Sequence, residues 1–502
     1  MHDTVLASTT DVVSQLLVAG LLFALFTVLA LEKAHRVLVA LGAVAATWGI
    51  SYLTPYRLLT LEGAQRALDV NVLLLLAAMM ALVGVLKSTG VFAWAVDGIV
   101  DRFDGQPVRA IAALWWFTAI ASAFADNVTT VIFVTPIVLA IIKRLELPAL
   151  PVLLPMIMAA NIGGTATLIG DPPNIMIGSG AGLSFLDFLE ELTIPTLLMM
   201  CALHWWGARR LRREIAGRPL AAATMNGEEA RITDPGLLRW MAAISGVVLL
   251  GFVTHGVTGM PAAVPAVLGA AVALIVQDVR YLRTHRPSHE ERTHGILHVL
   301  ETEIEWPTLT FFVFLFILVG AAVDTGLIAT LAGALEGAIL NGRDLLGLGD
   351  RGTMLFAAFL VLWVAGVLSA VMDNIPFVAV SIPIVGALGV ALPGDGRVLW
   401  WALSLGACLG GNGTPIGASA NVTTLGLAER AGIRITFREF MGTGIPVMVF
   451  TLLVSSAFLA GFVSLGPSEV AWVGGGVLAV ALVGLWRYEV GAGRGANVVG
   501  VR

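Results

Sequence analysis

Long apolar stretches separated by short polar segments dominate the hydrophobic pattern of this chain. Residues 12–31, 237–255 and 447–465 each approach the roughly 20 apolar residues that a helix needs to cross a bilayer. The pattern predicts an all-α polytopic membrane protein with about eleven transmembrane helices. The predicted spans lie near 12–32, 37–53, 70–87, 148–178, 187–207, 236–256, 259–277, 306–323, 398–427, 440–461 and 471–486.

Two further apolar segments, about 108–145 and 353–391, are too long for one crossing and carry an Asp-Asn pair near the middle. We interpret each as a re-entrant hairpin that enters and leaves the membrane on the same side. Irregular backbone at membrane depth is tolerated only where protein or a water-filled cavity satisfies its polar groups.

The chain repeats one polar template in its two halves. The first copy has SAFADNVTTVIFVTPIV from Ser122 and NIGGTATLIGDPPNI from Asn161. The second has SAVMDNIPFVAVSIPIV from Ser369 and CLGGNGTPIGASANV from Cys408, at a constant offset of 247 residues. Polar, glycine-interrupted segments at matching places in two apolar halves are the best sequence indication of a transporter's binding site.

A shorter match extends the repeat upstream. The segment 82–90 matches 318–326 at an offset of 236, so eleven residues are inserted later, in what we expect to be the loop before the second hairpin. The predicted first repeat is 1–207, with its broken helix near 148–178, and the second is 236–465, with its broken helix near 398–427. A cytoplasmic linker, 208–235, joins them, and an extra C-terminal helix and tail, 466–502, follow.

The distribution of Lys and Arg predicts the orientation in the cell membrane. With the N-terminus outside and the C-terminus cytoplasmic, 24 of the 29 Lys and Arg residues fall on the cytoplasmic side. Five crossings separate the starts of the third and eighth spans, an odd number, so the two repeats are expected to have inverted topology. The five outer residues are Arg57, Arg66, Arg343, Arg351 and Arg397.

The composition agrees with this class. Hydrophobic residues make up 58% of the chain and charged residues 13%, which is far from a typical soluble domain. Two cysteines, Cys201 and Cys408, are too few for a disulfide framework or a cysteine-rich zinc site. No nucleophile–base set accompanies the motifs, so we expect no enzyme, no cofactor, no metal site and no nucleic-acid partner, with Na⁺ as a candidate bound ion.

Asp126 and Asp373 are the most informative polar residues in the chain. Each is followed by an asparagine, Asn127 or Asn374. A carboxylate at membrane depth costs on the order of 3 kcal/mol and is rarely placed there without a role. Carboxylate and amide oxygens suit protons or hard cations, which predicts that these four residues bind the coupling ion. The structural alternative is that the two aspartates cap helices at the hairpin tips.

The glycine-rich stretches 163–167 and 410–414 are expected to unwind two spans. A half-helix that begins after such a break offers free N–H groups and a positive dipole end to an anion. The alternative is close helix packing by small residues. The predicted substrate-binding residues are Gly163, Gly164, Thr165, Thr167, Asn174, Gly410, Gly411, Asn412, Thr414 and Asn421.

Asp171 breaks the symmetry of the repeat, because the matching position is Ala418. It either caps the half-helix that follows, with Pro172 in the first turn, or titrates. The sequence leaves both alternatives open.

The motifs SAFADNVTTVIFVTPI, NIGGTATLIGDPPNIMIGS, MDNIPFVAVSIPI and GACLGGNGTPIGASANV resemble the arsenite-permease and pigmentation P-protein branch of the ion transporter superfamily. This branch has the citrate-transporter-like domain and is more distantly related to NhaD-type antiporters and divalent-anion/sodium symporters. The resemblance covers roughly residues 15–465 and implies an inverted-repeat fold, often a homodimer, with scaffold and transport domains. The symporters carry Ser-Asn-Thr at each tip, where this chain has Asp-Asn-Val and Asp-Asn-Ile; this departure favours coupling through a carboxylate.

These features predict a secondary active transporter that moves a small inorganic or organic ion across the lipid bilayer. The leading hypothesis is an anion permease or exchanger coupled to H⁺ or Na⁺. The alternative is a Na⁺/H⁺ antiporter of the NhaD type, and an anion channel on the same fold is the third. The sequence does not choose among citrate, arsenite, chloride and Na⁺, or between symport and antiport.

Overall fold

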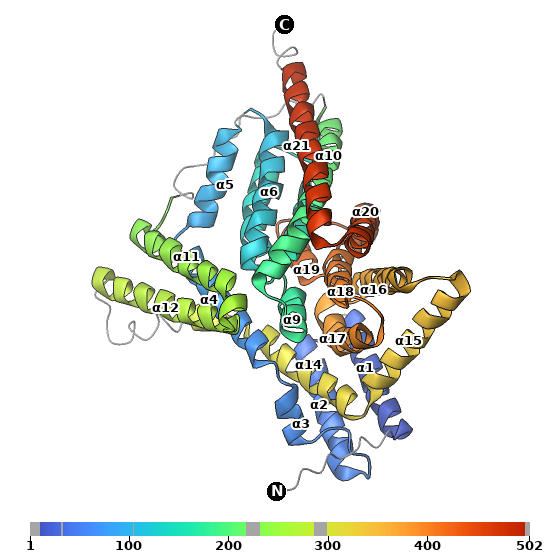
Figure 1. Ribbon diagram of the computed structural model, residues 1–502. Coiled ribbons are helices and arrows are strands. Elements are labelled where there is room, and N and C mark those ends of the chain that lie inside the picture. The colour runs from blue at the N-terminus through green and yellow to red at the C-terminus, as the bar shows by residue number, and fades with distance from the viewer. Residues whose placement is uncertain (1–10, 32–33, 104, 217–230, 286–298, 497–502) are drawn as a thin grey trace.

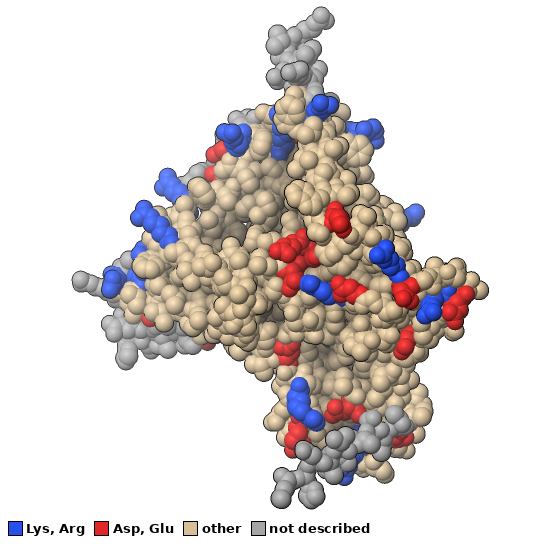
Figure 2. All heavy atoms as spheres, viewed as in Figure 1, with Lys and Arg blue, Asp and Glu red and all other residues tan. Residues whose placement is uncertain are grey.

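The computed structural model describes residues 11–31, 34–103, 105–216, 231–285 and 299–496, in which helices are the only regular secondary structure (Figure 1). Within these ranges, twelve helices are long and apolar enough to cross a membrane. Figure 2 shows a largely uncharged surface, as expected where lipid surrounds the side chains. The chain is therefore a multi-pass membrane protein of the all-α class.

Every predicted span corresponds to one or two helices. The first half contains α1 Val12–Ala30, α2 Arg36–Leu53, α3 Leu61–Ala67, α4 Val70–Ser88, α5 Val91–Arg102, α6 Pro107–Ala125, α7 Asn127–Arg144, α8 Leu150–Thr165, α9 Pro172–Ala181 and α10 Phe185–Ile215. The second contains α11 Pro235–Thr258, α12 Ala263–His285, α14 Trp306–Asp324, α15 Leu327–Leu346, α16 Asp350–Val371, α17 Asn374–Ala391, α18 Arg397–Gly410, the 3₁₀ turn η1 Gly411–Gly413, α19 Ser419–Arg430, α20 Phe437–Leu465 and α21 Pro467–Ala496. Residues 217–230 of the predicted linker and 497–502 of the tail lie outside the described residues.

The two predicted hairpins are confirmed as helix pairs. Helices α6 and α7 meet at Asp126, and α16 and α17 meet at Met372 and Asp373. Each pair packs against the broken helix of its own half, α6 on α8 and α16 on α18. The Ser122 hydroxyl donates to the Ala160 carbonyl at 2.7 Å, and 247 residues later the Ser369 hydroxyl donates to the Ala407 carbonyl at 2.5 Å.

The two broken helices are also confirmed. The first break lies after its glycine pair, and the second begins at Gly411, where the 3₁₀ turn η1 follows α18. Helix α8 continues through Gly163 and Gly164 to Thr165, and the irregular segment follows at 166–171. The predicted stretches 163–167 and 410–414 thus do interrupt the two helices, although Gly163 and Gly164 themselves stay helical. A Cβ at Gly163 would overlap the backbone of Ala119 in α6, and one at Gly410 would overlap the backbone of Gly366 in α16. These two glycines permit close helix packing, the alternative that the sequence had offered.

The inserted residues of the second half form helix and not loop. Gly90 and Gly326 adopt left-handed conformations with φ of 77° and 76°, and each precedes an added helix. Helix α5 has 12 residues and α15 has 20, so eight of the eleven inserted residues lengthen α15. The expectation of a longer loop is wrong, because the insert is rich in Leu and Ala, which favour helix.

The two halves interlock at the centre of the molecule. Helix α7 packs against α19, and α17 packs against α9, so the second helix of each hairpin contacts the broken helix of the other half. Helix α8 also packs against α18. This exchange of contacts brings the two hairpin tips to one place, whereas the opposite membrane orientation of the halves stays a prediction.

Candidate transport site

The turn of each hairpin places an aspartate at the N-cap of the following helix. Asp126 accepts hydrogen bonds from the Thr129 backbone N–H at 2.8 Å and from the Thr129 hydroxyl at 2.6 Å. Asp373 accepts from the Ile375 backbone N–H at 3.1 Å and from the Ser419 hydroxyl at 2.8 Å. The capping role is therefore present at both tips. Each carboxylate also has a hydroxyl oxygen beside it, and both oxygen types are ligands of hard cations.

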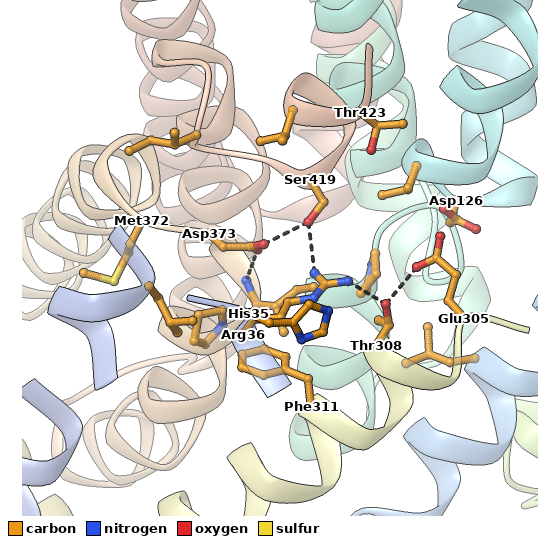
Figure 3. Close-up of a pocket in the computed structure, with 18 of the residues that line it drawn as sticks. His35, Arg36, Asp126, Glu305, Thr308, Phe311, Met372, Asp373, Ser419 and Thr423 are labelled. Carbon is orange, nitrogen blue, oxygen red and sulfur yellow. Dashed lines mark hydrogen bonds between the residues drawn. The ribbon is translucent and has the colours of Figure 1, made fainter. Parts of the chain in front are cut away.

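Both tips line one cavity of about 400 Å³, at which several helices begin (Figure 3). The residues at these helix starts are Arg36 of α2, Asp126 before α7, Pro172 of α9, Glu305 before α14, Asp373 before α17 and Ser419 of α19. The N-terminus of a helix carries a partial positive charge and backbone N–H donors. Converging helix N-termini are therefore well suited to an anion.

Arg36 connects two sides of the cavity through hydroxyl groups (Figure 3). Its Nη2 donates to Thr308 Oγ1 at 2.6 Å, and its Nη1 donates to Ser419 Oγ at 3.5 Å. Thr308 donates in turn to the Glu305 carboxylate at 2.7 Å, and Ser419 donates to Asp373. A hydrogen-bonded chain thus runs between two carboxylates with the guanidinium at its centre. Because these partners of Arg36 are neutral hydroxyls, its planar charge can still recognise a carboxylate or oxyanion.

The cavity holds more acid than base. Among the described residues that line it, Asp126, Asp373 and Glu305 contribute three carboxylates against the guanidinium of Arg36, so their formal sum with His35 neutral is −2. A cation beside the tip carboxylates would offset the repulsion that they exert on an anion. Among the described residues, no three His, Cys, Asp or Glu side chains converge in the manner of a metal centre.

A layer of buried asparagines lies behind the tips, between the two broken helices. The Asn161 amide nitrogen donates to the side-chain oxygens of Asn412 at 3.1 Å and Asn421 at 3.0 Å. Its oxygen accepts from the Asn127 amide at 3.3 Å. Asn174 and Asn421 each donate to backbone carbonyls that the break in their own half leaves free. The asparagines thus donate hydrogen bonds to the free carbonyls of the interrupted helices and connect the two halves.

The ten predicted substrate-binding residues do not line the cavity in this conformation. Nine are buried and Thr414 is half-buried. Asn127 and Asn374, predicted to bind the coupling ion, are each 3% exposed and also lie behind the cavity wall. Direct contact of these residues with a substrate would require another conformation, and their binding roles stay predictions.

Asp171 is 2% exposed and occupies the N-cap position of α9, yet its side chain makes no capping hydrogen bond. Its Oδ2 has no hydrogen-bond partner. Of the two alternatives that the sequence left open, capping is thus absent from this structure.

Sequence reasoning missed Arg36, Glu305 and Thr308 as site residues. The charge pattern assigned Arg36 to the cytoplasmic side, as a residue between the first two spans. The packing of α2 against α14 places it with Thr308 in the cavity. Only Ser419 carried a sequence signal, since it lies within the second repeated motif.

Comparison with known proteins identifies the family to which this arrangement belongs. The CitMHS citrate transporter family matches residues 26–406. The chain belongs to the citrate transporter family. This match confirms the resemblance to the ion transporter superfamily, and it makes the protein a membrane transporter and not an enzyme.

Individual relatives agree with this assignment. An uncharacterized transporter of Mycobacterium tuberculosis is 36% identical over 439 residues, which cover 87% of this chain and 96% of the relative. The human P protein is 30% identical over 518 residues, with 88% of this chain matched, and the match spans only 59% of that longer protein. The crystal structure of the Alcanivorax borkumensis YdaH transporter has the same fold, with a TM-score of 0.58 at 15% identity over 90% of this chain and 98% of that one.

Proposed function

We propose that this transporter is a secondary active anion permease or exchanger coupled to H⁺ or Na⁺. The observation that carries the proposal is the presence of Arg36 in the same cavity as both hairpin tips. A fixed guanidinium surrounded by helix N-termini offers an anion a positive charge and hydrogen-bond donors. The coupling cation would bind at Asp126 and Asp373, where each carboxylate already lies beside a hydroxyl oxygen.

The excess of carboxylates supports an order of binding. With three acids and one guanidinium among the described lining residues, an anion that arrives alone meets net repulsion from them. A proton or Na⁺ at a tip removes part of this charge, so cation uptake would raise the affinity for the anion. Such coupling is reciprocal, because the bound anion then raises the affinity for the cation.

A Na⁺/H⁺ antiporter is the second candidate, favoured by the same three carboxylates. It would use Asp126 and Asp373 without an anionic substrate, and Arg36 would then serve only to hold the chain of hydroxyls between Asp373 and Glu305. An anion channel is the third candidate and would need no coupling ion.

We further propose inverted membrane orientation of the two repeats, a homodimer, an external N-terminus and a cytoplasmic C-terminus. The duplicated contacts at an offset of 247 and the exchanged packing of α7 with α19 and α17 with α9 support the inverted repeat. The charge distribution supports the orientation of the termini, and the family resemblance supports the dimer.

A flux assay in proteoliposomes distinguishes the three candidates. Vesicles loaded with pyranine receive citrate, arsenite, chloride or Na⁺, with citrate first because of the family's name. A coupled permease should move protons or Na⁺ only when its anion is present, whereas an antiporter should alkalinise the lumen on Na⁺ alone. Anion flux without any coupled ion movement would indicate a channel and contradict the leading proposal.

Substitution of Arg36 tests the anion site. Arg36→Gln should lower anion uptake by more than about tenfold, because a charge-assisted hydrogen bond to the substrate is lost. Arg36→Lys should retain part of the activity, since it keeps the charge but not the planar fork. Arg343→Gln is the matched control, as Arg343 is half-buried outside the cavity and pairs only loosely with Asp344 at 3.8 Å. Unchanged anion uptake in Arg36→Gln would exclude Arg36 from the substrate site.

Substitution of the tip carboxylates tests the coupling site. Asp126→Asn and Asp373→Asn keep a side chain that caps helices well, so both variants should fold. Each should lose ion-coupled flux, because the amide can neither take up a proton nor neutralise Na⁺. Wild-type coupled flux in both variants would contradict the assignment.

A further inference from the structure

Three aspartates lie at helix starts in the centre of the molecule, and one of them differs from the other two. Asp126 and Asp373 each accept a backbone N–H and a hydroxyl. Asp171 stands at the N-cap of α9, where Pro173 at the second helical position removes one of the N–H groups that a cap would bind, and it makes no capping bond. Its role is therefore not the one that the hairpin-tip aspartates perform.

Asp171 is enclosed by groups that do not neutralise it. The side chains of Asn127 from α7 and Cys408 from α18 face it directly. The charged groups beyond them are the carboxylates of Asp126 and Asp373, which face it from the two hairpin tips. Among the described residues, no ion pair includes Asp171.

Buried polar atoms at this position lack hydrogen-bond partners. Asp171 is 2% exposed, and its Oδ2 lacks any hydrogen-bond partner. In the adjacent asparagine layer, the fully buried Asn412 also has an unpartnered amide nitrogen. An ionised carboxylate that is buried with one oxygen unpartnered, with no cation and with only neutral side chains beside it is unfavourable, whereas a neutral carboxyl group in the same place costs far less. The site therefore favours the protonated acid.

We propose that Asp171 binds one coupling proton per protomer, at a buried site separate from the two hairpin-tip carboxylates. It takes up the proton from water as the neutral carboxylic acid and returns it as the carboxylate when the surrounding helices rearrange. The site exists only once, because the second repeat has Ala418 at the matching position. That this proton is coupled to transport rests on the proposed function, whereas binding of the proton at Asp171 does not.

Infrared difference spectroscopy between neutral and alkaline pH tests the proposal without any transport. The wild-type protein in lipid should have a protonated carboxyl C=O band at neutral pH, and Asp171→Asn should lose it. Asp234→Asn is the matched control, since Asp234 is also an N-cap aspartate followed by proline. The hydrogen bonds from Arg280 hold the pKa of Asp234 below its usual range, so it remains ionised and gives no such band.

The result can be read even if Asp171→Asn folds poorly. Asp171→Glu keeps an acid at the site, and its band should appear at a shifted frequency. A band that persists unchanged in Asp171→Asn, an unshifted band in Asp171→Glu, or no band in the wild type would each overturn the proposal. If the bands behave as expected while proteoliposomes show no anion flux, then the proposed function fails and the proton site stands.

Discussion

The first hairpin and broken helix make the same backbone contacts as their counterparts 247 residues later, yet behind the duplicated Asp-Asn tips the two halves differ in a buried acid and in part of their buried amides. The shared contacts come from the serine on the first hairpin helix and the glycine on the broken helix. The differences are Asp171 against Ala418, Asn161 against Cys408 and Thr165 against Asn412. Residues that position helices and the Asp-Asn pair at each tip are thus duplicated, whereas the buried Asp171 and the bridging asparagines Asn161 and Asn412 are not.

The hairpin tips differ in a second way, in their backbone. Asp126 has φ +48° and ψ 156°, a region that is essentially reserved for glycine, whereas Asp373 has φ −53° and ψ 135°. Both tips end in a capped helix, so the strain at Asp126 is not needed to form a cap. Strain of this kind is retained where the surrounding structure imposes it. The backbone of the first tip is therefore the more strained of the two.

Among the substitutions that compare the two halves, the largest loss of stability should come from the packing glycines. Gly163→Ala and Gly410→Ala should each destabilise the protein by about 3 kcal/mol, because the added Cβ meets helix backbone and not a movable side chain. If the halves are duplicated in packing, the two losses should be similar. Unfolding by SDS titration in mixed micelles would measure both.

A matched control for this pair is Gly426→Ala in α19, where an added Cβ meets nothing within 4 Å. This change should be neutral or should stabilise the helix by up to about 1 kcal/mol. A loss for Gly163→Ala no larger than that of the control would show that the close approach of α6 and α8 is not required.

The spans, the hairpins and the breaks could be predicted because each depends on local pattern. Apolar length defines a span, and a polar Asp-Asn pair inside an overlong apolar segment defines a hairpin tip. The constant offset of 247 then identified which polar residues correspond. What the two glycine pairs do could not be decided locally, because unwinding and close packing both require glycine.

The cavity itself could not be predicted, because its residues are brought together by tertiary packing. Arg36 and Glu305 each lie at the start of an apolar span, which is where a charged residue ordinarily meets the membrane surface. Their convergence with the tips depends on how α2 and α14 pack, and neither residue belongs to a repeated motif. The periodicity of a single sequence does not indicate which distant helices pack together.

The next largest loss of stability should come from substitution of Asp126 at the strained first tip. Asp126→Ala should cost about 2 kcal/mol, since it loses a cap and leaves a Cβ in an unfavourable conformation. Asp373→Ala should cost about 1 kcal/mol, for the cap alone. Asp126→Gly should recover part of the loss at the first tip, because glycine adopts this conformation freely. SDS titration of all three variants would test this, and equal losses for the two alanine variants would show that the tips do not differ in strain.

The smallest effect should come from the serines that join each hairpin to its broken helix. Ser122→Ala and Ser369→Ala each remove one buried hydroxyl that donates to a carbonyl, at 2.7 Å and 2.5 Å. Each should lower stability by about 1 kcal/mol, since the carbonyl that loses its partner is already engaged within a helix. The double variant should lose the sum of the two, because the two bonds lie in different halves and share no residue. A markedly larger combined loss would mean that the two repeats do not pack as independent copies but depend on each other through the asparagines between them.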